Sequence, residues 1–327
     1  MIEKTFSSDT NRMTAKKFLL IAPGEMPIPP VSGWGALERV VWSYKTELEK
    51  LGHTVAIFND ADSFKCLDLY REFRPDVIHL HLGKHFELMK LLRAPIKLVT
   101  SHAGNFEACK GFFGNVAGNF LSDCTFSVLT SWESEFFSSI GVRSVNIIPN
   151  GVDIDRFAGA GTGTPVLPAS IYLAKVAPIK RQALLQRAGI NCFFAGPIQD
   201  PSFDSSDPNY LGNWTEEEVN ENLPRFSNLV LLSEMELQPL VCLEALAAGL
   251  GLVISECAAQ NLDTSKPWIK VIDEEELKDI SYVNNCITEN AKLALSCRDE
   301  IREYASRFSW KNIIKNEYIP MLQKLSN

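Results

Sequence analysis

Short apolar segments alternate with helical patterns along almost the whole chain. In the first half, apolar runs of strand length occur at residues 17–22, 54–58, 76–80, 96–101, 125–129 and 145–148. After the first run, Gly52 ends an amphipathic helix whose apolar face consists of Leu37, Val40, Val41, Tyr44, Leu48 and Leu51. This alternation predicts an α/β fold, with a parallel sheet and helices on both of its faces.

The second half repeats the alternation after an interruption. Residues 158–168 are rich in Gly and Pro and have no periodicity, so we expect a linker there. Apolar runs then return at residues 169–175, 191–195, 229–232 and 252–255. Ligands of open α/β sheets bind beyond the carboxyl ends of the strands, so we predict two Rossmann-like domains that face a central cleft.

The predicted domain boundaries follow from these patterns. Residues 1–15 are polar and are expected to form a disordered tail, while residues 310–327 have helical spacing. We therefore expect an N-terminal domain at 16–157 and a C-terminal domain at 169–309. The final helix can then pack back on the N-terminal domain.

An acidic pair stands out in apolar sequence. The segment Leu240–Ala248 is apolar on every side and has Glu244 as its only charge, while Glu236 precedes it. An unpaired carboxylate in a buried helix costs several kcal/mol, so Glu244 requires a hydrogen-bonding partner or a ligand. Pro239 suits the start of this helix and Gly249 its end, and the free amides of the first turn can bind an anion. Carboxylates can bind hydroxyl groups, and the neighbouring amides can bind phosphate. Together they indicate a site for a phosphorylated sugar or nucleotide.

Composition narrows the class of protein. The length of 327 residues favours two domains. The formal net charge of −8 argues against nucleic acid as a partner. Eight cysteines occur without a Cys-x-x-Cys pair, as expected for reduced thiols in a cytoplasmic protein. No apolar run reaches the roughly 20 residues of a membrane span, and no secretory signal precedes the first strand.

Two lysines follow the first strand of the second half. Lys175 and Lys180 would lie at a strand terminus, where ammonium groups suit a diphosphate leaving group. A solvated basic turn is an equally common reason for such a pair.

A loop at residues 27–38 carries Gly33 and Gly35 between the first strand and the first helix. These glycines would let the backbone approach a ligand closely. A rigid turn without a ligand is the alternative. Asp60 after the second strand also suggests a dinucleotide-binding fingerprint, but Glu38 occupies the position of its third glycine.

Histidines cluster in the first half. His79 and His81 share one face of a strand and His85 follows, but no acid or thiol completes a metal-ligand set, so no metal site is expected. His102 ends the next strand, at the predicted cleft, and is the better functional candidate.

An aromatic cluster follows this strand, and it consists of Phe106, Phe112, Phe113 and Phe120. Such a cluster most often belongs to the core. If it were exposed, it would suit an apolar acceptor or the surface of a membrane.

Four stretches of the chain, in this order, resemble glycosyltransferase family 4, the retaining transferases with the two-domain GT-B fold. They are the loop from Gly33 to Val41, His102, the Pro149-Asn-Gly-Val-Asp153 stretch with Phe157, and Glu236-x7-Glu244 with its Ala-Leu-Ala-Ala-Gly249 continuation. The resemblance runs from about Lys16 to the C-terminus, and the paired-glutamate motif is its most specific part.

The resemblance implies a set of donor-binding residues. Glu244 would bind the ribose hydroxyls of a nucleotide-sugar, and the amides of Leu240 and Val241 would lie near its phosphate. Gly33 and Gly35 would border the acceptor and the diphosphate.

The resemblance also implies the catalytic residues and a metal-independent reaction without a cofactor. Glu236 would hold hydroxyls of the transferred sugar, and His102 would contact this sugar near the reacting carbon. Lys175 and Lys180 would neutralise the departing diphosphate. Lys175 replaces the arginine that is usual in the family, which preserves the charge but loses the bidentate fork.

The sequence thus predicts a cytoplasmic, retaining hexosyltransferase that uses a nucleotide-diphosphate-sugar. Its acceptor is an unidentified hydroxyl on a glycan, a lipid-linked sugar or a small molecule, and contact with a membrane surface is an option. Lys175, together with Ala36 in place of a second family glycine, motivates one alternative, a non-catalytic sugar-nucleotide-binding subunit. A second alternative, an NAD-dependent oxidoreductase, follows from the glycine pair and Asp60.

Overall fold

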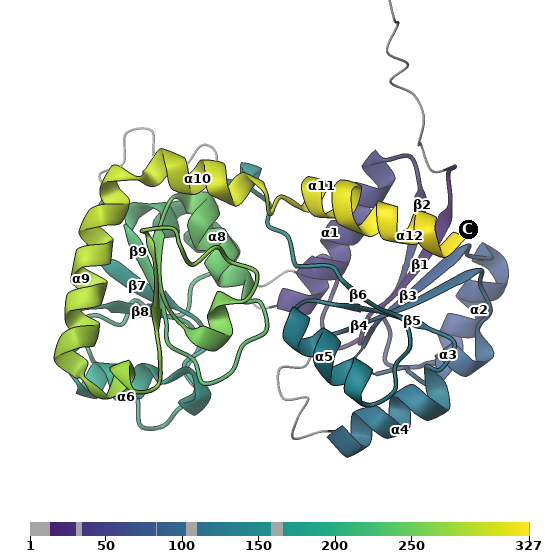
Figure 1. Ribbon diagram of the computed structural model, residues 1–327, viewed down its shortest axis with the longest axis horizontal. Helices are drawn as coiled ribbons and strands as arrows, with labels where there is room; N and C mark the ends of the chain where they lie inside the picture. Colours follow the sequence, from purple (N-terminus) through teal and green to yellow (C-terminus); the bar gives the residue numbers. More distant parts are fainter. Residues whose placement is uncertain (1–13, 31–34, 83, 103–109, 158–165, 327) are drawn as a thin grey trace, which may run out of the picture.

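The computed structural model describes residues 14–30, 35–82, 84–102, 110–157 and 166–326 and contains two parallel sheets, each with helices around it (Figure 1). The first sheet has six strands in the order β2-β1-β3-β4-β5-β6. Their bounds are Lys17–Ile21 (β1), Thr54–Phe58 (β2), Val77–Leu82 (β3), Ile96–Ser101 (β4), Thr125–Val128 (β5) and Val145–Ile147 (β6). Each predicted run of the first half overlaps one of these strands, and β3 extends two residues beyond its run.

The helices of the first unit pack on both faces of this sheet. They are α1 (Ala36–Lys50), α2 (Phe64–Phe73), α3 (Leu88–Leu91), α4 (Lys110–Phe120) and α5 (Ser131–Ser139). The predicted apolar stripe of α1 buries Val40, Val41, Tyr44 and Leu48. It packs on one face of the sheet, while the opposite face is covered through residues of α4 and α5.

The second sheet has five strands in the order β11-β10-β9-β7-β8. They are Ser170–Leu173 (β7), Phe193–Ala195 (β8), Asn228–Leu231 (β9), Gly251–Ser255 (β10) and Ile269–Ile272 (β11). Helices α6 (Gln182–Arg187), α7 (Glu216–Asn222), α8 (Leu240–Ala248), α9 (Ile280–Ser296) and α10 (Arg298–Ser306) accompany it. The predicted pattern lacks β11, a four-residue edge strand in which Lys270 interrupts the apolar run.

The C-terminal segment returns to the first unit, as Figure 1 shows in yellow. It comprises α11 (Trp310–Ile313), a π-helical turn (Ile314–Tyr318) and α12 (Ile319–Ser326). Tyr318 and Leu322 are fully buried in the same core cluster as Leu48 of α1. None of the helices in the described ranges has the length and apolar character of a membrane-spanning segment.

The two crossings between the units run side by side. The amide of Val152 donates to the carbonyl of Phe308 at 2.8 Å, and the amide of Trp310 donates back to the carbonyl of Val152 at 3.2 Å. A Cβ atom on Gly151 would lie 2.6 Å from the Trp310 ring, so this close approach requires glycine. The predicted linker falls largely at 158–165, outside the described residues, and the domain boundaries remain predictions.

Candidate functional site

The two motif glutamates lie on the second unit, on and before α8. Pro239 is the N-cap of this helix, and Gly249 ends it with a φ of +84°. The side chains of Glu236 and Glu244 are only 12% and 16% exposed. Because both side chains are mostly buried, both carboxylates require partners, as the sequence predicted for Glu244.

Glu236 is paired with Lys180. The Lys180 ammonium group lies in ion-pair contact with Oε1 of Glu236. Lys180 ends a 3-10 turn (Pro178–Lys180) that follows β7, and the Tyr172 hydroxyl donates to its carbonyl oxygen at 2.6 Å. The turn after β7 and the loop before α8 thus bring a cation and an acid together at the carboxyl end of the second sheet.

Glu244 is paired with two arginines that the sequence did not identify. Its Oε1 accepts from Arg156 Nη1 at 2.7 Å and from Arg39 Nη1 at 3.4 Å. Arg39 comes from α1 of the first unit, so this contact joins the units. Glu216 of α7 lies 3.4 Å from Arg39 and 3.7 Å from Arg156. The lone charge in an apolar helix signalled that a partner was needed, but nothing in the local pattern pointed to these two residues.

Each glutamate binds its cation through one oxygen. None of the described hydrogen bonds or ion pairs uses Oε2 of Glu236 or Oε2 of Glu244. Neither Oε2 atom is among the buried unpaired atoms of the described residues. Both oxygens can therefore accept hydrogen bonds from hydroxyl groups of a ligand.

The other predicted donor residues are less closely grouped. Leu240 and Val241 form the first turn of α8, whose amides have no partner within the helix. Lys175 is exposed and makes no ion pair within the described part of the chain. Gly35 is the N-cap of α1, whereas Gly33 lies outside the described residues.

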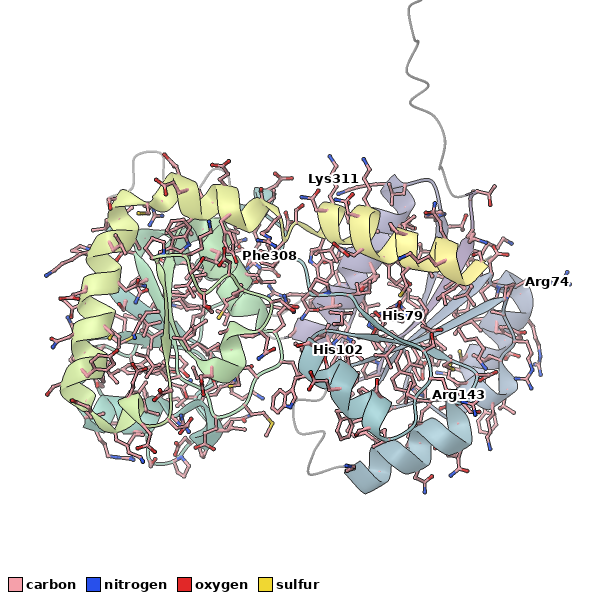
Figure 2. The ribbon with its side chains drawn as sticks, in the orientation of Figure 1. Arg74, His79, His102, Arg143, Phe308 and Lys311 are labelled. Carbon is pink, nitrogen blue, oxygen red and sulfur yellow. The ribbon has the colours of Figure 1, made fainter. Side chains whose placement is uncertain are left out.

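Three histidines form a row on the first sheet, in which His79 and His81 are buried and His102 is partly exposed. His81 Nδ1 lies 3.1 Å from His102 Nε2, and His79 Nε2 lies 2.7 Å from the Thr100 hydroxyl. The Tyr318 hydroxyl lies 3.0 Å from His79 Nδ1. Figure 2 shows His79 inside the first unit and His102 nearer the second. No described hydrogen bond joins His102 to either motif glutamate or to Lys180.

Burial keeps these imidazoles neutral. It lowers the pKa of His79 to about 3 and that of His102 to about 4. Burial, and to a lesser degree its two histidine neighbours, also lowers the pKa of His81 well below the usual value. At pH 7 the row therefore offers hydrogen bonds rather than positive charge.

The histidines do not gather as metal ligands. His85 lies apart, bonded to the Ser63 hydroxyl at 2.8 Å and to the Pro23 carbonyl at 3.2 Å. Over the described ranges, no three His, Cys, Asp or Glu side chains converge as a metal site would require.

Two further polar contacts join the units. The Asn150 amide donates to Gln238 Oε1, and Asn150 Nδ2 donates to the Gln238 carbonyl at 3.2 Å. The Asn261 side chain donates to the carbonyl of Leu129 at 2.8 Å. Asn150 thus connects the end of the first unit with the loop that carries Glu236.

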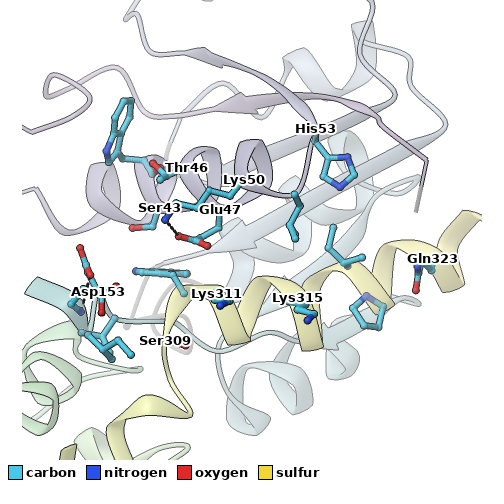
Figure 3. Close-up of a pocket in the computed structure, with 18 residues that line it drawn as sticks. Ser43, Thr46, Glu47, Lys50, His53, Asp153, Ser309, Lys311, Lys315 and Gln323 are labelled. Carbon is cyan, nitrogen blue, oxygen red and sulfur yellow. Dashed lines mark hydrogen bonds and ion pairs between the residues drawn. The ribbon is translucent and has the colours of Figure 1, made fainter. Parts of the chain in front are cut away.

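A cavity of about 1170 Å³ lies away from these residues (Figure 3). It opens between α1, the crossing at residues 152–155 and the C-terminal helices, where Lys50, Lys311 and Lys315 line it. None of the predicted site residues lines this cavity.

The aromatic cluster is divided between core and surface. Phe113 is buried, Phe120 is partly buried and Phe112 is 50% exposed. Phe106 lies outside the described residues. Contact with a membrane through this cluster remains a prediction.

Comparisons with known proteins identify the fold. No protein-family model matches the sequence, and no curated protein matches it. The structure is similar to sucrose-phosphate synthase from Thermosynechococcus elongatus, with 14% identity, a TM-score of 0.72 and coverage of 94% of this chain and 98% of that chain. It is also similar to AviGT4, a glycosyltransferase of avilamycin A biosynthesis (18% identity, TM-score 0.65, 95% and 98% coverage). Anabaena HepE in complex with UDP-glucose matches as well (15% identity, TM-score 0.67, 94% and 100% coverage). The predicted α/β GT-B fold with two Rossmann-like units is therefore confirmed.

Proposed function

We propose that the protein is a retaining glycosyltransferase of the family 4 type. It transfers a hexosyl group from a nucleotide-diphosphate-sugar to an acceptor hydroxyl without a metal ion or other cofactor. The observation that carries the proposal is the arrangement around α8, where Glu236 and Glu244 each hold a cation through Oε1 and keep Oε2 for hydroxyl groups. Glu236 would bind the transferred sugar and Glu244 the ribose.

The leaving diphosphate would be stabilised by fixed positive charge. Lys180 already lies beside Glu236, and the nine-residue helix α8 directs its N-terminal amides, at Leu240 and Val241, toward the same loop. Lys175 is exposed at the end of β7 and can reach an anion there. Such preorganised donors and charges stabilise the developing negative charge of a leaving group.

The first unit would bind the acceptor and the reacting sugar. His102 is neutral, so it contributes a hydrogen bond to the sugar rather than a charge. Gly35, the N-cap of α1, would border the site from this side. Retention requires the acceptor hydroxyl to approach on the face from which the diphosphate leaves, and holding both substrates in this geometry supplies much of the rate enhancement.

UDP-glucose is the first donor to test, because HepE was solved with it. We expect it to raise the melting temperature, and its turnover with a panel of hydroxyl acceptors to persist in EDTA. Glu244→Gln should weaken the stabilisation by the nucleotide, while Glu289→Gln on α9 serves as the matched control. Strict dependence on a divalent metal would contradict the proposed chemistry, and no response to any nucleotide-sugar would reject the donor class.

A non-catalytic sugar-nucleotide-binding subunit is the second candidate. It is favoured by Lys175, which stands where the family usually has arginine and makes no ion pair within the described part of the chain. Stabilisation by nucleotides without turnover of any donor, over a wide acceptor panel, would support this candidate instead.

The cysteines favour a cytoplasmic location. All seven in the described part of the chain are free thiols. Phe112 offers one exposed aromatic side chain for a membrane surface or an apolar acceptor. Binding to anionic vesicles, compared between the wild type and Phe112→Ser, would test this contact.

A further inference from the structure

We propose that His81 is a positioning residue that fixes His102 as the neutral tautomer protonated on Nδ1. His102 then presents an N–H donor to an oxygen of the bound substrate. The role toward substrate rests on the proposed function, whereas the tautomer is a property of the protein alone.

The two rings have the geometry of a hydrogen bond in the ring plane. Nδ1 of His81 and Nε2 of His102 are 3.1 Å apart. The ring planes differ by only 17°, with centroids 5.4 Å apart. An N–H on one ring therefore points at the lone pair of the other.

His81 is held firmly in this position. It stacks on His79 with centroids 4.3 Å apart, and the Tyr44 ring meets it edge to face at 5.5 Å. His79 is fixed in turn by the Thr100 and Tyr318 hydroxyls on its two ring nitrogens. Tyr318 belongs to the C-terminal segment, so that segment supports the row on the face of the sheet that it covers together with α1.

Counting protons leaves two arrangements. Both imidazoles are neutral and each carries one proton, and one proton must lie between the two facing nitrogens. In the first arrangement, His81 donates from Nδ1, and both rings are protonated on Nδ1. In the second, His102 donates from Nε2, and both rings are protonated on Nε2.

The other nitrogen of His81 decides between them. His81 Nε2 is buried and has no hydrogen-bond partner among the described residues. The second arrangement would place an N–H there without an acceptor, and an unpaired buried donor costs about 1–3 kcal/mol. The first arrangement leaves only a lone pair unpaired, which native proteins tolerate more often than an orphaned buried N–H. The structure therefore favours protonation on Nδ1, the reverse of the tautomer that dominates for histidine in water.

The consequence falls on His102. Its Nε2 is occupied as an acceptor, so Nδ1–H is the remaining polar group of the ring. His102 is partly exposed at the carboxyl end of β4, on the side of the first unit nearer the second (Figure 2). The ligand group that it can bind is an oxygen acceptor, such as a sugar hydroxyl or a phosphate oxygen.

Nitrogen NMR of protein labelled with ¹⁵N-histidine tests the assignment directly. The chain has five histidines, and the His102→Gln spectrum identifies the signals of His102. In the wild type we expect His102 to be protonated on Nδ1. We expect His81→Leu to shift it to the Nε2 tautomer and His81→Asn to preserve Nδ1, because an asparagine amide can donate from nearly the same position. Protonation of His102 on Nε2 in the wild type would overturn the proposal, whether or not either variant folds.

Kinetics test the effect on substrate. With a donor that the wild type turns over, we expect His81→Leu to lower kcat at least tenfold and His81→Asn to stay within about threefold of the wild type. Equal losses in the two variants would reject a positioning role. If the wild type turns over no donor at all, the proposed function fails, while the spectra still decide the tautomer.

Discussion

The two sheets differ in the polar side chains that they carry toward their carboxyl ends. On the first sheet, His79 and His81 are fully buried and neutral, and hydrogen bonds satisfy three of their four ring nitrogens. On the second, Lys180 and Glu236 form an ion pair, and neither side chain is fully buried. Two units with similar topology therefore offer different chemistry, hydrogen bonds from one and charge from the other.

The position of each group in the fold explains this difference. The histidines lie within β3, on a face that α1 and the C-terminal segment cover, where desolvation disfavours the cation. Lys180 and Glu236 lie in loops beyond β7 and β9, where each has an oppositely charged partner and neither side chain is fully buried. A donor with a diphosphate would accordingly bind the second unit, and a neutral hydroxyl acceptor suits the first.

The largest expected effect, on turnover, comes from removing the charge of Lys180 at the carboxyl end of the second sheet. Lys180→Met should reduce turnover by about 10²–10³-fold, the usual loss when one preorganised group at a developing charge is removed. Steady-state kinetics with UDP-glucose would measure it. Lys278→Met, on the exposed surface, is the control and should leave kcat unchanged. Full activity of Lys180→Met would remove this residue from the proposed machinery.

A smaller effect is expected on stability when the buried histidines are challenged by acid. Their pKa values are lower in the folded state than the usual 6.5, so the unfolded chain binds more protons as the pH falls from 6.5 toward 3. The free energy of unfolding should therefore fall by about 1.4 kcal/mol per pH unit for each buried histidine. Urea denaturation between pH 7 and pH 5 would measure the slope of the unfolding free energy against pH. His79→Gln should reduce this slope by the contribution of one proton, about 1.4 kcal/mol per pH unit.

Glu133 provides the opposing control in this experiment. Burial raises the pKa of this carboxyl group to about 8, so the folded state retains a proton that the unfolded state releases above about pH 4.5. Its contribution to stability is present at low pH and is lost as the pH rises toward 8. Glu133→Gln should remove this contribution and steepen the acid dependence of the histidines. An unfolding free energy independent of pH in both proteins would contradict the neutral histidine row.

The smallest effect is expected where the two units meet. Arg39→Met removes two ion pairs of 3.4 Å, to Glu216 and Glu244, and should change the unfolding free energy by less than about 1 kcal/mol. Arg156→Met should cost somewhat more, because its 2.7 Å bond to Glu244 is shorter than the 3.4 Å contact with Arg39 that would remain. Thermal and urea denaturation of both variants would test this order. An equal or larger loss for Arg39→Met would show that the contact between units, rather than Arg156, holds Glu244.

The local pattern of the sequence was sufficient for most of the architecture. Alternating apolar runs predicted ten of the strands, and the segment Leu240–Ala248, between Pro239 and Gly249, predicted α8. These features depend on neighbours within a few residues, which a linear pattern records. The short edge strand β11 escaped because its apolar run is interrupted by Lys270.

Tertiary structure alone decided which groups meet. The need of Glu244 for a partner was readable from its apolar helix, but Arg39 and Arg156 lie 205 and 88 positions away in the sequence. The pairing of His81 with His102, and the support from Tyr318, likewise depend on strand register and on the return of the C-terminal segment to the first sheet. A sequence determines hydrophobic faces locally, because they follow from the period of helix and strand. Partners for buried polar groups are selected by long-range packing, which no local period encodes.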